Sequence, residues 1–131
     1  MKTLATLAAA LAATAVHAAD LTIELRGNAT APVYVALYDS ADAWLKDGRA
    51  LKAVKAVPGE RLVITGLAPG RYAFSFYEDA NGNGKLDRNL FGMPTERYGM
   101  SRDATGTMGP PSFDAAAFEL SGDATQAAGL Q

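Results

Sequence analysis

Short runs of alternating apolar and polar residues, each followed by a turn sequence, are the feature that most restricts the fold of this chain. Every second position is apolar at Leu21, Ile23 and Leu25 within residues 21–27, and at Val33, Val35 and Leu37 within residues 33–40. This period of two places the apolar side chains on one face of a β-strand, whereas an α-helix needs a period near 3.6. The same reasoning predicts strands at residues 50–57, 61–67, 71–80 and 115–122, with a short edge strand near 124–130.

Turn residues separate these runs. Asn28 to Pro32, Pro58-Gly59 and Ala68 to Gly70 interrupt the alternation with residues that favour turns. We expect the first two strands to form a hairpin or to be neighbours. We therefore predict an all-β fold, an antiparallel β-sandwich of six to seven strands with a long irregular loop segment.

A short non-strand insertion follows the second predicted strand. Ser40 is a good N-cap and Gly48 a good terminator, so residues 41–48 are expected to form a turn of helix. The insertion holds the sole tryptophan, Trp44. An aromatic platform for a ligand is one interpretation of Trp44, and packing against the sandwich is the other.

The N-terminus is typical of a secretory signal peptide. Lys2 supplies a positive charge, an Ala- and Leu-rich run follows to Val16, and Ala18 ends a small-residue cleavage site. The run is shorter than the ~20 residues that span a bilayer, so no transmembrane segment is expected in the mature chain. We therefore divide the chain into a signal peptide, residues 1–18, and a single β-sandwich domain, residues 19–131, and expect the protein to be periplasmic or secreted.

The mature domain would contain neither histidine nor cysteine, because the chain has no cysteine and its one histidine is His17. This excludes Ser-His-Asp and Cys-His nucleophilic catalysis and zinc sites built from Cys and His. The whole chain has a formal net charge of −2. Such mild acidity gives no reason to expect nucleic acid or an anionic membrane as a partner.

Residues 78–112 lack any sustained period and contain repeated Gly and Pro. Long structureless loops are uncommon in compact domains and are usually functional or disordered. Several large apolar residues make disorder a poor explanation here. Something should therefore order this segment.

The acidic loop at residues 79–87, DANGNGKLD, begins this segment and is the best candidate site. It resembles an EF-hand-type calcium loop, with Asp79, Asn81, Asn83 and Asp87 as side-chain ligands and the backbone carbonyl of Lys85 as a further ligand. Gly82 and Gly84 permit the positive φ angles of a tight turn. Calcium prefers such hard oxygen ligands.

The loop lacks the acid expected at position twelve, where Leu90 stands. Glu78, Asn89, Glu96 or water would have to complete the shell, so we predict a weak Ca²⁺ site, with a dissociation constant of ~10⁻⁴ to 10⁻³ M. A tight hairpin without metal is the alternative, since Asn-Gly repeats also favour turns.

Two other kinds of site were weighed. Met93, Met100 and Met108 could offer thioether ligands to Cu(I), although methionines more often fill gaps in cores. Asp79, Asp87 and Glu96 could supply a carboxylate pair for glycan hydrolysis.

The run YEDANGNGKLDRNLFGMPTERYGMS at residues 77–101, followed by GPPSFDAAAF at 109–118, resembles domain of unknown function 2141, a family of small exported bacterial proteins. The one departure is Met100, where an aromatic residue is more often expected. The run from Leu67 to Asp87 is also similar to transthyretin-like (prealbumin) and surface-adhesin sandwiches. That similarity implies a binding or structural role.

We expect a non-enzymatic exported β-sandwich that binds calcium through residues 79–87 and contacts an unknown protein or glycan. The residues that would face this partner are Arg88, Phe91, Glu96, Arg97 and Tyr98. The alternatives are a carboxylate-dependent glycan hydrolase and a passive surface or adhesion module without a ligand.

Overall fold

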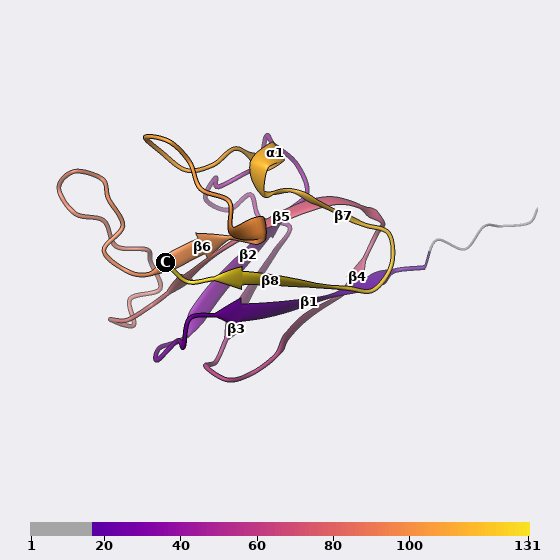
Figure 1. Cartoon of the computed structure of the whole chain (residues 1–131), viewed down its shortest axis with the longest axis horizontal. Helices are drawn as coiled ribbons and strands as arrows, with labels where there is room; N and C mark the ends of the chain where they lie inside the picture. Colours follow the sequence, from indigo (N-terminus) through magenta and orange to yellow (C-terminus); the bar gives the residue numbers. More distant parts are fainter. Residues whose placement is uncertain (1–16) are drawn as a thin grey trace, which may run out of the picture.

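The computed structural model describes residues 17–131, and the predicted signal peptide lies almost wholly outside the described residues (Figure 1). Within this range the regular secondary structure is almost entirely β-strand, as predicted. The strands are β1 (Ala19–Arg26), β2 (Val33–Tyr38), β3 (Lys52–Ala56), β4 (Leu62–Leu67), β5 (Gly70–Glu78), β6 (Tyr98–Met100), β7 (Phe118–Leu120) and β8 (Ala124–Gly129). A 3₁₀ turn, η1 (Ser101–Asp103), and a short helix, α1 (Phe113–Ala116), complete the elements of this part of the chain.

The described strands form two sheets. One has the order β4-β1-β8, and the other has the order β3-β2-β5-β6, with β7 also paired to β5. Their pairings are antiparallel apart from β1 with β8, which run parallel. The prediction that the first two strands pair is wrong, since β1 and β2 lie in different sheets. Alternation identifies the buried face of a strand but not its neighbour, and residues 27–32 carry the chain from one layer to the other.

The main core fills the space between the two sheets, and it includes most of the apolar residues that the alternation selected. Adjacent sheets bury facing side chains, which removes apolar area from water at about 25 cal/mol per Å². The most deeply buried members are Leu21 and Ile23 of β1, Val33, Val35 and Leu37 of β2, Phe74 and Phe76 of β5, and Leu120 of β7.

A seam between β6 and the C-terminus joins the sheets along one side. The amide of Tyr98 donates to the carbonyl of Gln131 at 3.3 Å, and the amide of Gln131 donates to the carbonyl of Tyr98 at 2.9 Å. Beside this pair, Asp103 accepts from the amide of Gly129 at 2.8 Å and from Arg26 at 2.5 Å. β6 was not predicted, because three residues are too few to show a period.

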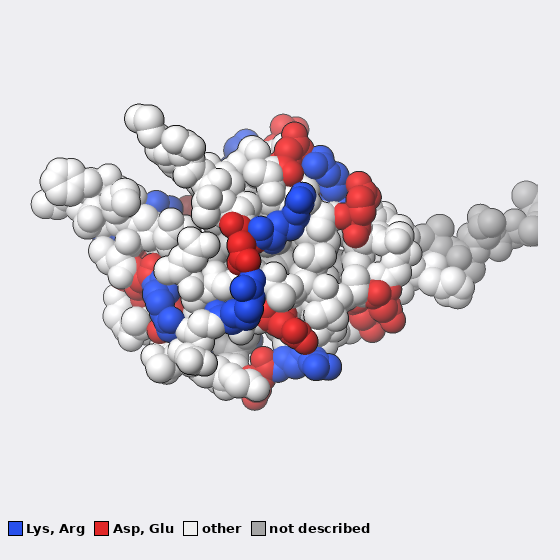
Figure 2. All heavy atoms as spheres, in the orientation of Figure 1, with Lys and Arg blue, Asp and Glu red and all other residues white. Residues whose placement is uncertain are grey.

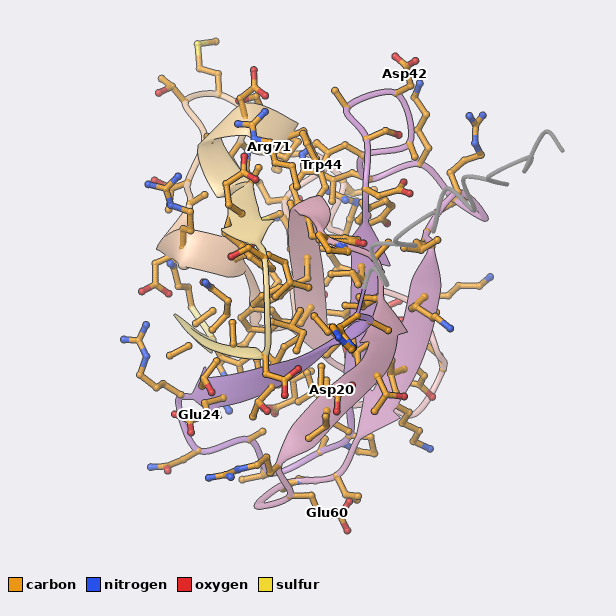
Figure 3. All side chains as sticks on the ribbon, turned by 90° about the vertical axis from the view of Figure 1, so that its right-hand side faces the viewer. Asp20, Glu24, Asp42, Trp44, Glu60 and Arg71 are labelled. Carbon is orange, nitrogen blue, oxygen red and sulfur yellow. The ribbon has the colours of Figure 1, made fainter. Side chains whose placement is uncertain are left out.

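A second apolar cluster covers one end of the outer face of the β3-β2-β5-β6 sheet. Trp44 packs in it, edge-on to Tyr38 and Phe113, and its indole N–H donates to the carbonyl of Pro111 at 2.9 Å. Arg71 lies over the Phe113 ring and pairs with Asp114 at 2.7 Å, and Figure 3 shows Trp44 and Arg71 at the same end of the molecule. Trp44 is therefore a packing residue and not an open platform.

Two local predictions need correction. Residues 41–45 form turns and no regular helix, although Ser40 does accept from the amide of Ala43 at 3.3 Å. The strand predicted at 115–122 is shorter, because Ser112 caps the helix α1 by accepting from the amide of Ala115. Alternation resumes only at Phe118.

No helix within residues 17–131 has the length and apolar character needed to cross a bilayer.

Candidate functional site

The acidic loop leaves the sheet directly at the end of β5, and Asp79 is its fixed point. Asp79 is only 3% exposed, and its amide donates to the carbonyl of Pro32 at 2.9 Å. Its carboxylate oxygens accept from the amides of Asn83 and Gly84 at 3.1 and 2.8 Å. Gly82 and Gly84 have φ angles of 73° and 72°, so the chain can fold back around the carboxylate. A buried carboxylate thus sets the curvature of the loop.

The remaining side-chain ligands predicted from the sequence gather around Asp87. Its two oxygens accept from the side-chain amides of Asn81 and Asn83, the latter at 2.7 Å. The carboxamide oxygen of Asn81 accepts from the amide of Asn83 at 3.2 Å, and that of Asn83 accepts from the amide of Lys85 at 3.0 Å. The side chains of Asn81, Asn83 and Asp87 thus form one hydrogen-bonded cluster, and Asp79 is linked to it through the backbone amide of Asn83.

Glu96 closes the neck of the loop. One of its oxygens accepts from the amide of Ala80 at 2.6 Å and the other from the amide of Asp87 at 3.1 Å. Next to it, the carbonyl of Asp87 accepts from both the amide and the hydroxyl of Thr95, at 2.8 and 3.1 Å. Residues that follow the loop thus hold its two ends together.

The other residues considered as further ligands are engaged elsewhere. Glu78 is buried and pairs with Arg97 at 2.6 Å, and Arg97 also donates to the carbonyl of Gly27 at 2.6 Å. Asn89 bonds within its own turn, and Leu90 points into solvent. Within residues 17–131 no group of three or more Asp, Glu, His or Cys residues is arranged to hold a metal ion. A cation at this loop would therefore depend on carboxamide and backbone oxygens as much as on carboxylates.

Tyr77 connects the acidic loop with a groove on the outer face of the sheet. Its hydroxyl donates to the carbonyl of Gly84 at 2.7 Å. Burial raises the pKa of Tyr77, and the nearby carboxylates of Asp79, Glu96 and Asp87 raise it further. The ring stacks on Tyr34 with centroids 5.5 Å apart, and Lys55 lies 5.8 Å from the centroid of Tyr34.

This groove, a cavity of about 360 Å³, runs across β3, β2 and β5. Pairing places Lys55, Tyr34, Tyr77 and Tyr98 in one row across four strands. The next row contains Ala53, Ala36 and Ser75, whose small side chains form the floor. The groove thus offers aromatic, hydroxyl and ammonium groups beside the acidic loop.

The two rival sites find no support in this geometry. Met100 is buried in the second cluster, whereas Met93 and Met108 are exposed. Asp79, Asp87 and Glu96 each accept two N–H groups, and none of them lines either of the two cavities described.

Four contributors to the site were not recognised from the sequence. They are the hydroxyl of Tyr77, the ion pair of Glu78 with Arg97, the carbonyl of Pro32 and Thr95 at the neck. Tyr77 could have been noted, because it belongs to a predicted strand that ends at the loop. The other three depend on contacts between segments separated in sequence, for which alternation gives no signal.

Comparison with known proteins gives one match. The family model described as "Uncharacterized protein conserved in bacteria (DUF2141)" matches residues 21–128, which include every described strand except part of β1 and of β8. No curated protein and no solved structure matches the chain.

Proposed function

The chain belongs to the DUF2141 family of uncharacterized bacterial proteins, and from its site we propose that it is an exported, non-enzymatic β-sandwich that binds Ca²⁺ through the loop at residues 79–87. The ligands would be the side chains of Asp79, Asn81, Asn83 and Asp87 and the carbonyl of Lys85. The observation that supports the proposal is the hydrogen-bonded loop in which Asn81 and Asn83 bind Asp87 and the Asp79 carboxylate accepts the backbone amide of Asn83.

The loop needs little rearrangement to accept a cation. Each carboxamide oxygen and each oxygen of Asp79 accepts one backbone N–H and retains a second lone pair. The ion would take the place of the two side-chain amide groups that now bind Asp87. This exchange, together with the small number of carboxylates, supports a weak site of ~10⁻⁴ to 10⁻³ M.

Binding of Ca²⁺ would also stabilise one wall of the groove. The carbonyl of Gly84 accepts from Tyr77, which lines the groove, so fixing the loop fixes one wall. We assign the unknown protein or glycan partner to this surface, where the tyrosine row and Lys55 are available. The function proposed is thus calcium-stabilised binding and not catalysis.

Thermal unfolding of EDTA-stripped protein with and without Ca²⁺ tests the site. At about 10 mM Ca²⁺ the predicted affinity stabilises the fold by about 1.4 to 2.7 kcal/mol, which raises the melting temperature by several degrees. Mg²⁺ should have a smaller effect, because it requires closer octahedral ligands. Isothermal titration should show heat for Ca²⁺ under the same conditions.

Asp87→Asn is the sharpest variant. It keeps the shape of the side chain and one of the two oxygens that accept from Asn81 and Asn83, and it removes one charge. Changing Asp79 would instead remove the bonds to the backbone amides around which the loop folds. Asp47→Asn, at an exposed position outside the loop, is the matched control. We expect Ca²⁺ stabilisation to be lost in Asp87→Asn and kept in Asp47→Asn. Absence of both heat and a melting shift in the unaltered protein would show that the loop is a metal-free turn.

A further inference from the structure

The acidic loop contains the same dipeptide twice, as Asn81-Gly82 and Asn83-Gly84, and the two copies have nearly the same geometry. Their glycines have φ angles of 73° and 72°. In each copy the carboxamide oxygen of the asparagine accepts from the backbone amide two residues later, and its side-chain amide donates to Asp87. All four residues of the two copies are exposed. The copies therefore form a matched pair within one loop.

An asparagine that precedes glycine can react with its own backbone. The backbone nitrogen of the glycine loses its proton and attacks Cγ of the asparagine, which closes a succinimide ring and expels the side-chain nitrogen as ammonia. Water then opens the ring at one of its two carbonyl groups and gives aspartate or isoaspartate. The net change is the gain of one water and the loss of one ammonia, with no oxidation. Glycine favours the attack because it has no Cβ to obstruct it.

The two copies differ at the nitrogen that would attack. The amide of Gly84 donates to the carboxylate of Asp79 at 2.8 Å, and Asp79 is buried. Removal of the proton from Gly84 would place two negative charges side by side, so this bond opposes the reaction. The amide of Gly82 has no acceptor in the part of the chain that the structure describes. The first copy therefore has a free nucleophile, and the second does not.

The groups that assist the attack are otherwise alike in the two copies. The negative charge that forms on the carboxamide oxygen is stabilised by an amide donor in both, from Asn83 at 3.2 Å for Asn81 and from Lys85 at 3.0 Å for Asn83. Acidic and basic side chains are also mixed over the face drawn in Figure 2, without a large patch of one sign. The bond at the glycine nitrogen is thus the difference that decides between the copies.

We propose that Asn81 is a site of spontaneous deamidation, and that Asp79 protects Asn83 from the same reaction. The protecting bond is a hydrogen bond to a charged group, which must break before Gly84 can attack. It should slow the reaction of Asn83 by about ten- to hundredfold, which corresponds to about 1.4–2.7 kcal/mol in the barrier.

Deamidation of Asn81 would change the charge and the bonding of the loop. The side-chain amide of Asn81 donates to Asp87, and the aspartate product places a carboxylate there instead. Without a metal ion the loop would lose a hydrogen bond and gain a repulsion. A third carboxylate beside those of Asp79 and Asp87 would favour a bound cation. This consequence rests on the proposed calcium site, whereas the reaction itself does not.

Mass spectrometry of the full chain, incubated in neutral buffer with EDTA, tests the site. Fragmentation of the peptide that contains both copies should show deamidation at Asn81 at least about tenfold faster than at Asn83. EDTA keeps calcium out, so the result does not depend on whether the loop binds Ca²⁺. The same chain unfolded in urea is the control. The bond between Gly84 and Asp79 is then absent, and the two asparagines should react at similar rates.

Two variants separate the protecting bond from the other contacts of the loop. Asp79→Ala frees the amide of Gly84 and should raise the rate at Asn83 towards that at Asn81. Asp87→Asn is the matched control, because it changes a carboxylate of the same loop and leaves the bond at Gly84 in place. The preference for Asn81 should remain in Asp87→Asn. Circular dichroism checks that both variants are folded, and the urea comparison on the unaltered chain needs neither of them.

Three outcomes would overturn the proposal. They are deamidation of the folded chain at Asn83 as fast as at Asn81, reaction of Asn81 only in urea, and an unchanged rate at Asn83 in folded Asp79→Ala.

Discussion

Gly99, at the centre of β6, is the position where a substitution best tests the packing of β6 against β8 and Phe76. A Cβ atom added there would lie 2.5 Å from the carbonyl oxygen of Gly129 and 2.5 Å from Cζ of Phe76. Ordinary contacts begin near 3.4 Å, and the carbonyl oxygen belongs to backbone that is fixed by strand pairing. Gly99→Ala must therefore push β6 away from β8 or move a buried ring.

Overpacking of this kind destabilises by about 1–3 kcal/mol, and we expect the upper half of that range because a ring and a main chain are both obstructed. For a domain of this size each kcal/mol lowers the melting temperature by roughly 4 °C. Urea unfolding followed by circular dichroism should show a lower midpoint with an unchanged slope.

Gly122→Ala is the matched control for this experiment. A Cβ at Gly122, in the turn between β7 and β8, has no neighbour within 4 Å. Its stability should be unchanged or slightly raised, since alanine restricts the unfolded chain. Equal stability of Gly99→Ala and Gly122→Ala would refute the close contact of β6 with both Phe76 and β8.

Three other changes test the surroundings of the site. Arg97→Ala leaves Glu78, which is buried, without its charged partner, so the free energy of unfolding should fall by about 2 kcal/mol in urea titrations, with Arg97→Lys recovering part of the loss. The amide of Gly129 and the Arg26 guanidinium lower the pKa of Asp103, so its contribution to stability is present above pH ~4 and is lost as the pH falls through the folded-state pKa. The difference in unfolding free energy between the unaltered chain and Asp103→Asn should accordingly shrink below pH ~4, and a difference that grows on acidification would contradict the assignment. Tyr77→Phe removes the hydrogen bond to the Gly84 carbonyl and keeps the aromatic ring that lines the groove. The free energy of Ca²⁺ binding, measured by titration, should be less favourable by about 0.5–1.5 kcal/mol.

The faces of the strands were predictable from the sequence, but their neighbours were not. Leu21, Val35 and Phe74 lie in the core as the alternation requires, because burial on one face of a strand has a period of two. The parallel pairing of β1 with β8 joins the two ends of the domain. Nothing local specifies that contact, so the expected hairpin of β1 with β2 was wrong. The likeness to transthyretin stays a prediction.

The candidate site was predictable to a similar extent. Spacing placed Asp79, Asn81, Asn83 and Asp87 together, because alternate positions of a tight turn face inward, and the structure does join them by hydrogen bonds. Whether they hold calcium stays a prediction. Glu96 appeared only as one of several possible ligands. Its place at the neck depends on the return of the chain through residues 88–95, which local pattern does not determine.

The irregular segment, residues 78–112, is held in place at both of its ends. At its start Asp79 folds the loop and Glu96 closes the neck, and at its end β6 is fixed between β5 and the C-terminus. Residues 88–94 lie between these two fixed regions and are shaped by Asn89, and their large apolar side chains stay outside both cores. These residues bury little of their own apolar surface, yet many polar contacts hold them in shape. Such a segment is explained better by the groups that it exposes for binding than by a contribution to the stability of the fold. For this reason we place the proposed cation at the base of this segment.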